Sequence, residues 1–238
     1  MKYPRILTAG DAAVVVEFGN EISPSINDQV KVFSQVIQEK KIPGIQDVIP
    51  TFRSVLINYE PSQLLYEEMT AFVNEVLASS ASYTETQKKV IRIPVCYGGD
   101  FGPDLAFTAE KAGMSEEEVI AVHSGTAYRI YMLGFLPGFA YLGGMDERLA
   151  MPRMEVPRLQ IEAGSVGIGG AQTGIYPMRS PAGWRLLGRT PVRPYDPARE
   201  EPLLYKAGDY IRFVPISREE YDRIAEQVEQ GTYLCETE

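Results

Sequence analysis

The sequence is poor in the residues that bind metals or form covalent cross-links. Its 238 residues include one histidine, His123, and two cysteines, Cys96 and Cys235. This supply excludes a disulfide framework and a structural zinc site built from cysteine and histidine. We therefore expect no cluster of metal ligands in this chain. The scarcity of cysteine also fits a protein of the reducing cytosol.

Long apolar runs and an excess of positive charge are lacking as well. No run approaches the roughly eighteen apolar residues of a membrane-spanning helix. The start, MKYPRILTAGD, has no apolar core typical of a signal peptide. The net charge of −9 disfavours extended contact with nucleic acid or anionic lipid. We predict a cytoplasmic protein that binds neither nucleic acid nor membrane. Its 45% of hydrophobic residues are enough for a packed core.

What is present first predicts a small α/β domain over residues 1–80. A β-branched strand lies in GDAAVVVEFG, residues 10–19, and Val55, Ile57 and Tyr59 alternate as in a half-buried strand. Apolar residues at helical spacing follow Pro24 and again follow Pro61. The expected order is β-α-β-β-α, with two helices on one face of a sheet.

Residues 81–89 are small, polar and then charged, and we interpret them as a linker to a second domain over residues 90–238. Two short helices are expected before His123, the second opened by a capping box of Ser115 and Glu118. Residues 134–197 then hold 11 of the 21 glycines and 8 of the 17 prolines. That texture predicts short strands between tight turns, as in a compact β-barrel. The predicted fold class is therefore α+β.

Common catalytic motifs are missing. No G-x-x-x-x-G-K-[ST] sequence is present, so no P-loop binds a nucleotide. Gly167 and Gly169 begin a dinucleotide fingerprint, but Gln172 occupies the place of its third glycine. Ser165 lies in a near miss to a nucleophile elbow, yet no helix is expected after it and the only histidine is upstream.

Three features remain as candidates for function. The first is a run of eight arginines and no lysine between Arg148 and Arg199, which indicates either an anion site or solvated arginines that pair with acids. The second is His123, either a general acid or base or a core histidine that caps a helix. The third is a set of glycine segments with aromatic residues, GFLPGFAYLGG, SVGIGGAQTGIYP and SPAGWRLLGRTP, which could wall a pocket or merely cover a barrel.

These segments, with IPVCYGGDFGPDL at residues 93–105, resemble the family that contains KipI, the B subunit of 5-oxoprolinase and the first subunit of allophanate hydrolase. The resemblance spans essentially the whole chain and is most specific over residues 93–194. It implies a small α/β N-terminal domain and a cyclophilin-like β-barrel.

The resemblance also implies a component of a multi-subunit enzyme that is inactive or nearly so alone. Together with a C-type partner, which is of the KipA type, and an A-type partner, it would open 5-oxo-L-proline to L-glutamate at the expense of ATP. The chain shows no ATP motif of its own, so ATP would be shared with, or bound by, the complex. The alternatives are an inhibitor of a sensor histidine kinase and a component of the allophanate hydrolase or urea carboxylase type.

A small amide that carries a carboxylate suits an arginine fork, an amide side chain and aromatic walls. We expect His123 and Gln172 to be catalytic, with His123 as the polarising or proton-transfer group, and Arg158 to anchor the carboxylate. The remaining substrate-binding candidates are the aromatic pair Tyr176 and Trp184 and the wall Pro137, Gly138 and Phe139.

Overall fold

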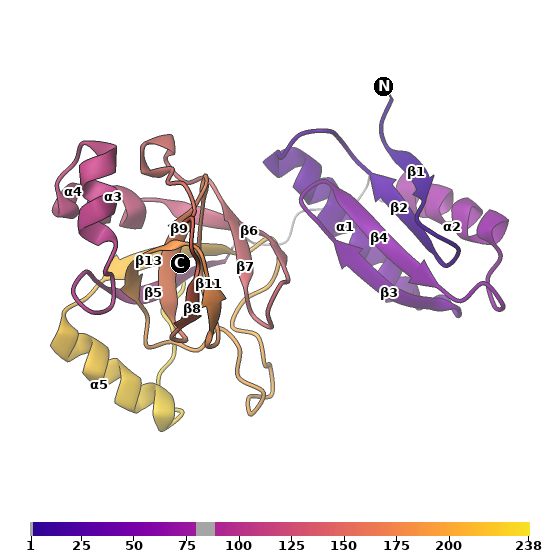
Figure 1. Ribbon diagram of the computed structural model, residues 1–238. Coiled ribbons are helices and arrows are strands. Elements are labelled where there is room, and N and C mark those ends of the chain that lie inside the picture. Colours follow the sequence, from indigo (N-terminus) through magenta and orange to yellow (C-terminus); the bar gives the residue numbers. More distant parts are fainter. Residues whose placement is uncertain (1, 80–88) are drawn as a thin grey trace. The chain divides into compact units, whose positions relative to one another are not determined.

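The computed structural model describes residues 2–79 and 89–238, and the chain divides into two compact units, Met1–Gln87 and Lys88–Glu238 (Figure 1). All of the predicted linker 81–89 except Lys89 lies outside the described residues. The predicted boundaries 1–80 and 90–238 therefore remain a proposal. Each unit has a core of its own, so each is described by itself.

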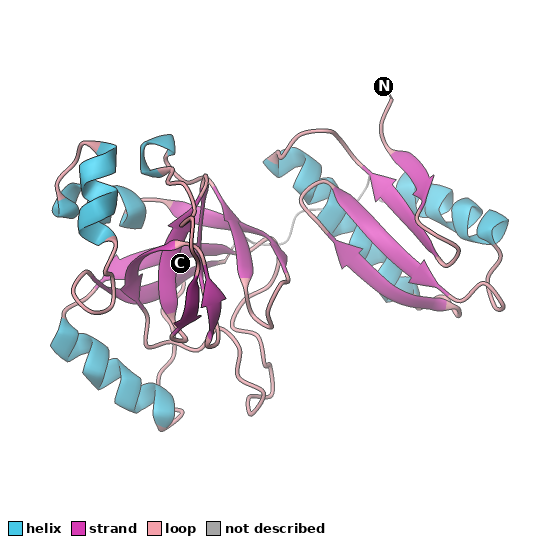
Figure 2. Cartoon of the chain, viewed as in Figure 1, coloured by secondary structure: helices cyan, strands magenta, loops and turns pink. Residues whose placement is uncertain are grey.

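The first unit is a four-stranded antiparallel sheet with two helices (Figure 2). Its elements are β1 (Arg5–Thr8), β2 (Ala13–Glu17), α1 (Pro24–Lys40), β3 (Ile45–Pro50), β4 (Ser54–Tyr59) and α2 (Tyr66–Ser79), and the strand order is β1-β2-β4-β3. Both helices pack their apolar stripes on one face of β2 and β4, where Phe33, Ile57 and Met69 are fully buried. The expected arrangement of two helices on one face is confirmed.

The expected order β-α-β-β-α omitted one strand, and the structure corrects it to β-β-α-β-β-α. The missing strand β1 is a short edge strand whose residues are half-buried or exposed. Arg5 pairs across the ladder with Glu17. Because an edge strand of four residues has no alternation of buried and exposed positions here, periodicity could not reveal it.

The second unit is built on a seven-stranded sheet in the order β10-β9-β12-β5-β13-β6-β7. Its strands are β5 (Val90–Tyr97), β6 (Ala127–Leu133), β7 (Ala140–Gly143), β9 (Ser165–Gly169), β10 (Gln172–Ile175), β12 (Arg185–Arg189) and β13 (Tyr210–Pro215). The outermost strands β7 and β10 approach each other, so the sheet nearly closes into a barrel. A separate pair, β8 (Arg158–Ile161) with β11 (Ser180–Ala182), completes the strands. The α+β class and the barrel-like second unit are confirmed.

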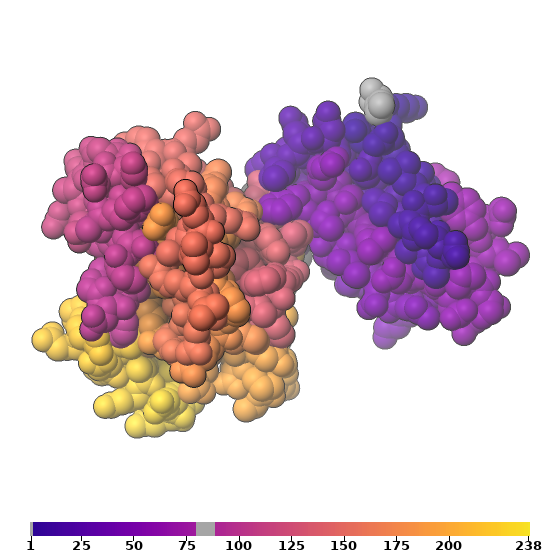
Figure 3. Space-filling model, in the orientation of Figure 1, coloured from indigo at the N-terminus to yellow at the C-terminus, as the bar shows by residue number. Residues whose placement is uncertain are grey.

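Helices lie on the outside of this barrel (Figure 1). They are α3 (Leu105–Ala112), α4 (Glu116–Ser124), α5 (Arg218–Glu229) and the short 3-10 helix η2 (Glu147–Leu149). The capping box of Ser115 and Glu118 forms as predicted. In the space-filling view, the salmon-to-orange part of the chain that contains β8 to β11 forms the visible front of the second unit (Figure 3). Among the described residues, no helix is both long enough and apolar enough to cross a membrane.

Candidate functional site

Three aromatic side chains from distant segments meet on the outside of the barrel. The ring centroids of Phe139, Tyr176 and Trp184 lie 5.6 to 5.8 Å apart, each pair edge to face. All three are buried, and Ile161, Ala182 and Leu186 complete the cluster. We call this the aromatic cluster. The structure thus places these three candidate residues next to one another, and their role in substrate binding stays a prediction.

Glycines make the floor of the aromatic cluster. A Cβ atom at Gly169 would lie 2.3 Å from the Trp184 ring, and one at Gly174 would lie 3.3 Å from it. The indole therefore rests directly on the backbone of β9 and β10. Gln172 pairs with Gly169 in the antiparallel ladder, and opposite residues direct their side chains to the same face. Gln172 thus belongs to the face that Trp184 covers.

We expect Gly169→Ala to displace the indole, because the added methyl group overlaps its ring. Overpacking of this kind costs roughly 1–3 kcal/mol. Trp184 is the only tryptophan in the chain, so intrinsic fluorescence reports the change directly. The expected result is a red-shifted emission and a lower denaturation midpoint. Gly170→Ala is the matched control, since nothing lies within 4 Å of a Cβ there, although its positive φ adds backbone strain. An unshifted emission for Gly169→Ala would contradict this packing.

Arg158 lies beside the cluster, held by a buried carboxylate. Its Nη2 donates to Asp104 at 2.9–3.0 Å, and its Nη1 donates to the carbonyl of Trp184 at 3.4 Å. Arg185 also approaches Asp104, at 3.6 Å, and its guanidinium lies 4.1 Å from the centre of the Phe107 ring. Two arginines share one carboxylate, so the group carries a net charge of +1 next to the aromatic cluster.

Most of the arginine run is engaged within the chain. Five of the eight form ion pairs, namely Arg148, Arg158, Arg179, Arg185 and Arg193. Arg189 and Arg199 donate to backbone carbonyls instead. The run therefore serves mainly to tie loops together, and it does not converge on one anion site.

His123 lies in the interior, at the end of α4. Its Nδ1 is 2.7 Å from the hydroxyl of Tyr97 and its Nε2 is 2.7 Å from the hydroxyl of Thr173. The ring stacks on Phe213 with centroids 4.6 Å apart. Thr173 donates to the carbonyl of Gly167, so its oxygen accepts from Nε2–H and Nδ1 accepts from Tyr97. Burial lowers the pKa of His123 from 6.5 to about 3, which keeps the ring neutral.

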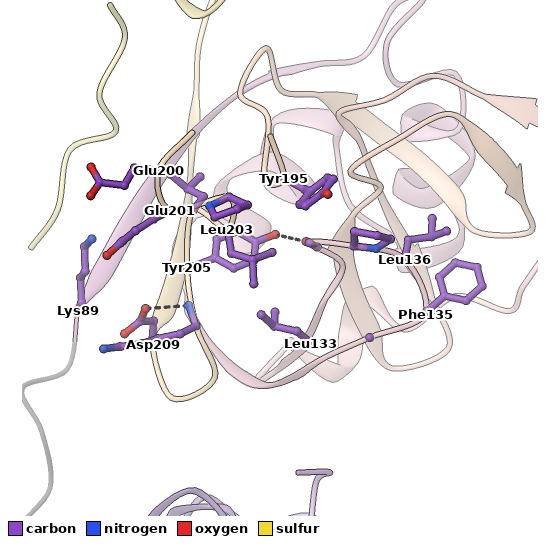
Figure 4. Close-up of a pocket in the computed structure, with 16 residues that line it drawn as sticks. Lys89, Leu133, Phe135, Leu136, Tyr195, Glu200, Glu201, Leu203, Tyr205 and Asp209 are labelled. Carbon is purple, nitrogen blue, oxygen red and sulfur yellow. Dashed lines mark hydrogen bonds between the residues drawn. The ribbon is translucent and has the colours of Figure 1, made fainter. Parts of the chain in front are cut away.

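A hollow of about 920 Å³ opens on another side of the Gly134–Phe139 turn (Figure 4). Its walls come from residues 133–138 and from the long connection before β13, with Tyr195, Leu203 and Tyr205. The hydroxyl of Tyr205 donates to the carbonyl of Gly138 at 2.8 Å and so joins the two walls. We call this space the loop hollow. Pro137 and Gly138 line it, while the ring of Phe139 packs in the aromatic cluster, so the three residues do not form one wall.

The predicted site residues therefore lie in three places. Gln172, Tyr176, Trp184, Phe139 and Arg158 gather around the outer face of β9 and β10, Pro137 and Gly138 line the loop hollow, and His123 is inside the barrel. Thr173 connects the first and last groups, because it follows Gln172 in β10 and bonds to His123. Burial raises the pKa of Tyr176 to about 12, with Arg153 opposing the shift, so its hydroxyl stays protonated.

Sequence reasoning missed Asp104, Thr173 and most of the lining of the loop hollow. Asp104 had a weak signal, since it is a lone polar residue between Pro103 and Leu105, whereas Thr173, between Gln172 and Gly174, had none. The hollow is lined partly by PLLY, residues 202–205, an apolar run in an otherwise polar connection. No group of three or more His, Cys, Asp or Glu side chains able to hold a metal occurs in the part of the chain that the structure describes.

Comparison with known proteins agrees with the resemblance seen in the sequence. Residues 4–205 match the family model "Carboxyltransferase domain, subdomain C and D". The B subunit of 5-oxoprolinase from Bacillus subtilis is 42% identical over 228 residues, which cover 92% of this chain and 95% of that protein. A conserved uncharacterized protein of known structure from Pyrococcus horikoshii is 46% identical, with a TM-score of 0.55, over 91% of this chain and all of that one.

A longer protein of known structure is 34% identical with a TM-score of 0.77, and the match covers 86% of this chain and 40% of that protein. The family match extends over both units and includes the glycine-rich turns that carry the aromatic cluster. The chain belongs to the carboxyltransferase subdomain C and D family, within which it is similar to the B subunit of 5-oxoprolinase.

Proposed function

We propose that this chain is the B subunit of an ATP-dependent 5-oxoprolinase, which cleaves 5-oxo-L-proline to L-glutamate. The observation that carries the proposal is the identity of 35–42% to three proteins named as the B subunit of 5-oxoprolinase, over about nine tenths of the chain. Those matches also span at least 95% of each relative. The likeness is therefore one of whole subunits.

The aromatic cluster and its polar neighbours are the proposed substrate face. Gln172 supplies an amide that can pair with a lactam, and Arg158 contributes to the net positive charge that attracts a carboxylate. Tyr176 and Trp184 give flat apolar walls. Pro137 and Gly138, with the Phe139 ring, form the adjoining turn. In the assembled enzyme, Arg158→Lys would raise KM because the planar fork is lost.

The sequence predicts that His123 transfers a proton. The surroundings of the His123 ring in the structure instead favour a role in positioning other residues. The ring is fully buried and its two nitrogens are both hydrogen-bonded, so it stays neutral at physiological pH. Through Thr173 it fixes the start of β10, where Gln172 lies. We therefore assign to His123 the task of holding Gln172 in register.

ATP fits this chain poorly, since seven of the eight arginines between Arg148 and Arg199 are engaged with acids or carbonyls and are not available to neutralise a triphosphate. We propose that ATP is bound by, or shared with, the partners in the complex, which are an A-type protein and a C-type protein of the KipA type. The role of this chain is then to complete the substrate site and to assemble with those partners.

Reconstitution tests the function. The chain is purified together with the A-type and C-type partners encoded by its genomic neighbours, and glutamate release from 5-oxoproline is measured with ATP. We expect turnover to disappear when this chain is omitted. Turnover that persists without it would refute the assignment. Allophanate and a urea-derived carboxylate, offered in parallel, test the alternative of an allophanate hydrolase type, and a kinase autophosphorylation assay with added protein tests the inhibitor alternative.

A further inference from the structure

Phe135 occupies a strained and exposed position at the rim of the loop hollow. Its φ is +67°, a left-handed conformation that bulky side chains rarely adopt. Even so, 67% of the residue is exposed to solvent. Its ring touches the edge of Phe139, with centroids 5.6 Å apart. A strained backbone that displays an aromatic ring is typical of a binding site.

The hollow behind Phe135 is largely apolar. Leu133, Leu136 and Leu203 line it, and Leu203 is itself 40% exposed (Figure 4). A volume of about 920 Å³ accommodates several large side chains of a partner. Large apolar surface of this kind, rimmed by polar residues, marks an interaction site on a protein surface.

Charge on the rim indicates what binds there. Glu200 and Glu201 lie side by side at the opposite end of the hollow from Phe135 (Figure 4), both exposed and without an ion pair in the described chain. Asp209, Lys89 and Lys206 also line the hollow, so its acids outnumber its lysines by three to two. A substrate that carries a carboxylate would be repelled by this pair of acids. In a partner segment, an apolar side chain would pack in the hollow, and a lysine or arginine next to it would be attracted by the two acids.

We propose that the loop hollow docks a segment of the C-type partner, in which a large apolar side chain fills the hollow and an adjacent basic residue pairs with Glu200 and Glu201. This inference rests on the proposed function, because it assigns to the assembly a specific surface of this chain. The hollow is separate from the substrate face, and the turn from Phe135 to Phe139 connects them. Docking at Phe135 therefore also fixes the ring of Phe139 in the aromatic cluster.

Binding of the purified chain to its C-type partner tests the proposal, with biolayer interferometry as the readout. We expect Phe135→Asp to weaken binding by at least about tenfold, as removal of a central aromatic anchor does. Combined Glu200→Lys and Glu201→Lys are expected to slow association about tenfold and to abolish its dependence on salt. Leu159→Asp is the matched control, since Leu159 is 93% exposed and lies outside the hollow.

The variants are first shown to fold, by thermal midpoints within about 3 °C of the wild type. Phe135→Asn is a second variant that suits the left-handed backbone, and it is expected to lose affinity as well. Unchanged Kd values for these variants, or an equal loss of affinity in Leu159→Asp, would overturn the proposal that the hollow is the docking surface. A raised KM for 5-oxoproline with an unchanged Kd for the C-type partner would assign the hollow to substrate and overturn it too.

Failure of this inference is distinguishable from failure of the proposed function. If omission of the wild-type chain abolishes glutamate release while the variants bind normally, only the docking surface is refuted. If the reconstituted mixture turns over without this chain, the assignment as the B subunit is refuted first.

Discussion

Replacing His123 with glutamine is expected to lower the free energy of unfolding of the second unit by about 2–4 kcal/mol at pH 7.5. The same substitution is expected to make the stability of that unit depend less on pH. Both effects follow from one neutral ring that is fully buried and hydrogen-bonded at both nitrogens. Glutamine has a donor and an acceptor, yet it lacks the ring that stacks on Phe213.

The sign of the pH effect follows from the lowered pKa. The pKa of His123 is about 3 in the folded chain and 6.5 for the free side chain. Between these values the unfolded state takes up a proton that the folded state does not bind. The stabilising contribution is therefore fully present above about pH 6.5 and is lost as the pH falls toward 3. The slope from this residue approaches about 1.4 kcal/mol for each pH unit.

Urea denaturation at pH 7.5, 6.5, 5.5 and 4.5, followed by the emission of Trp184, measures both effects. Trp184 lies in the same unit as His123, so its signal reports the relevant transition. Carboxylates add their own acid dependence to both proteins, and the difference between wild type and His123→Gln isolates the histidine. Parallel pH profiles for the two proteins would contradict a neutral, buried His123.

Helices were predictable because their apolar residues are periodic in the sequence, and the short barrel strands were predictable from the glycines and prolines of the turns between them. The stripe of Val30, Phe33 and Ile37 predicted α1, and the capping box of Ser115 predicted the start of α4. The strand β1 and the pairing of β13 parallel to β5 were not predictable in the same way. An edge strand lacks a buried face, and the choice of strand partner depends on contacts between segments more than a hundred residues apart.

The candidate site likewise has parts that the sequence predicted and parts that it did not. The glycine segments with aromatic residues were interpreted as pocket walls or as the cover of a barrel, and Phe139, Tyr176 and Trp184 from those segments do meet on the glycines of β9 and β10. The position of His123 at the end of a helix did not reveal that its side chain lies inside the barrel.

The loop hollow was recognised only through Pro137 and Gly138. Its other wall belongs to an irregular connection before β13, where apolar residues follow neither the spacing of a helix nor the alternation of a strand. The counter-ion of Arg158 was missed as well, because Asp104 lies 54 positions earlier in the chain.

Removing the carboxylate of Asp104 is expected to lower the free energy of unfolding by about 2–4 kcal/mol. The side chain is 8% exposed, and its oxygens accept from the backbone N–H of Leu186 at 2.7 Å and from Arg158 at 2.9–3.0 Å. Asp104→Ala leaves that N–H without an acceptor and leaves Arg158 and Arg185 without a counter-charge. Breaking a buried pair by deleting one partner costs about 3–5 kcal/mol. Partial exposure of the two guanidinium groups reduces this penalty.

A double-mutant cycle with Arg158→Met separates the ion pair from the other contacts of Asp104. We expect a coupling free energy of at least about 1 kcal/mol, because the two groups bond directly. Asp222→Ala is the matched control, since Asp222 and Arg218 form an Asp–Arg pair with both side chains about 60% exposed. Exposed pairs of that kind contribute under about 1 kcal/mol. If Asp104→Ala and Asp222→Ala lowered the free energy of unfolding equally, Asp104 would not be holding β8 and β12 against α3. Arg158 would then be free to turn toward a ligand, and its place beside Trp184 would have to depend on packing alone.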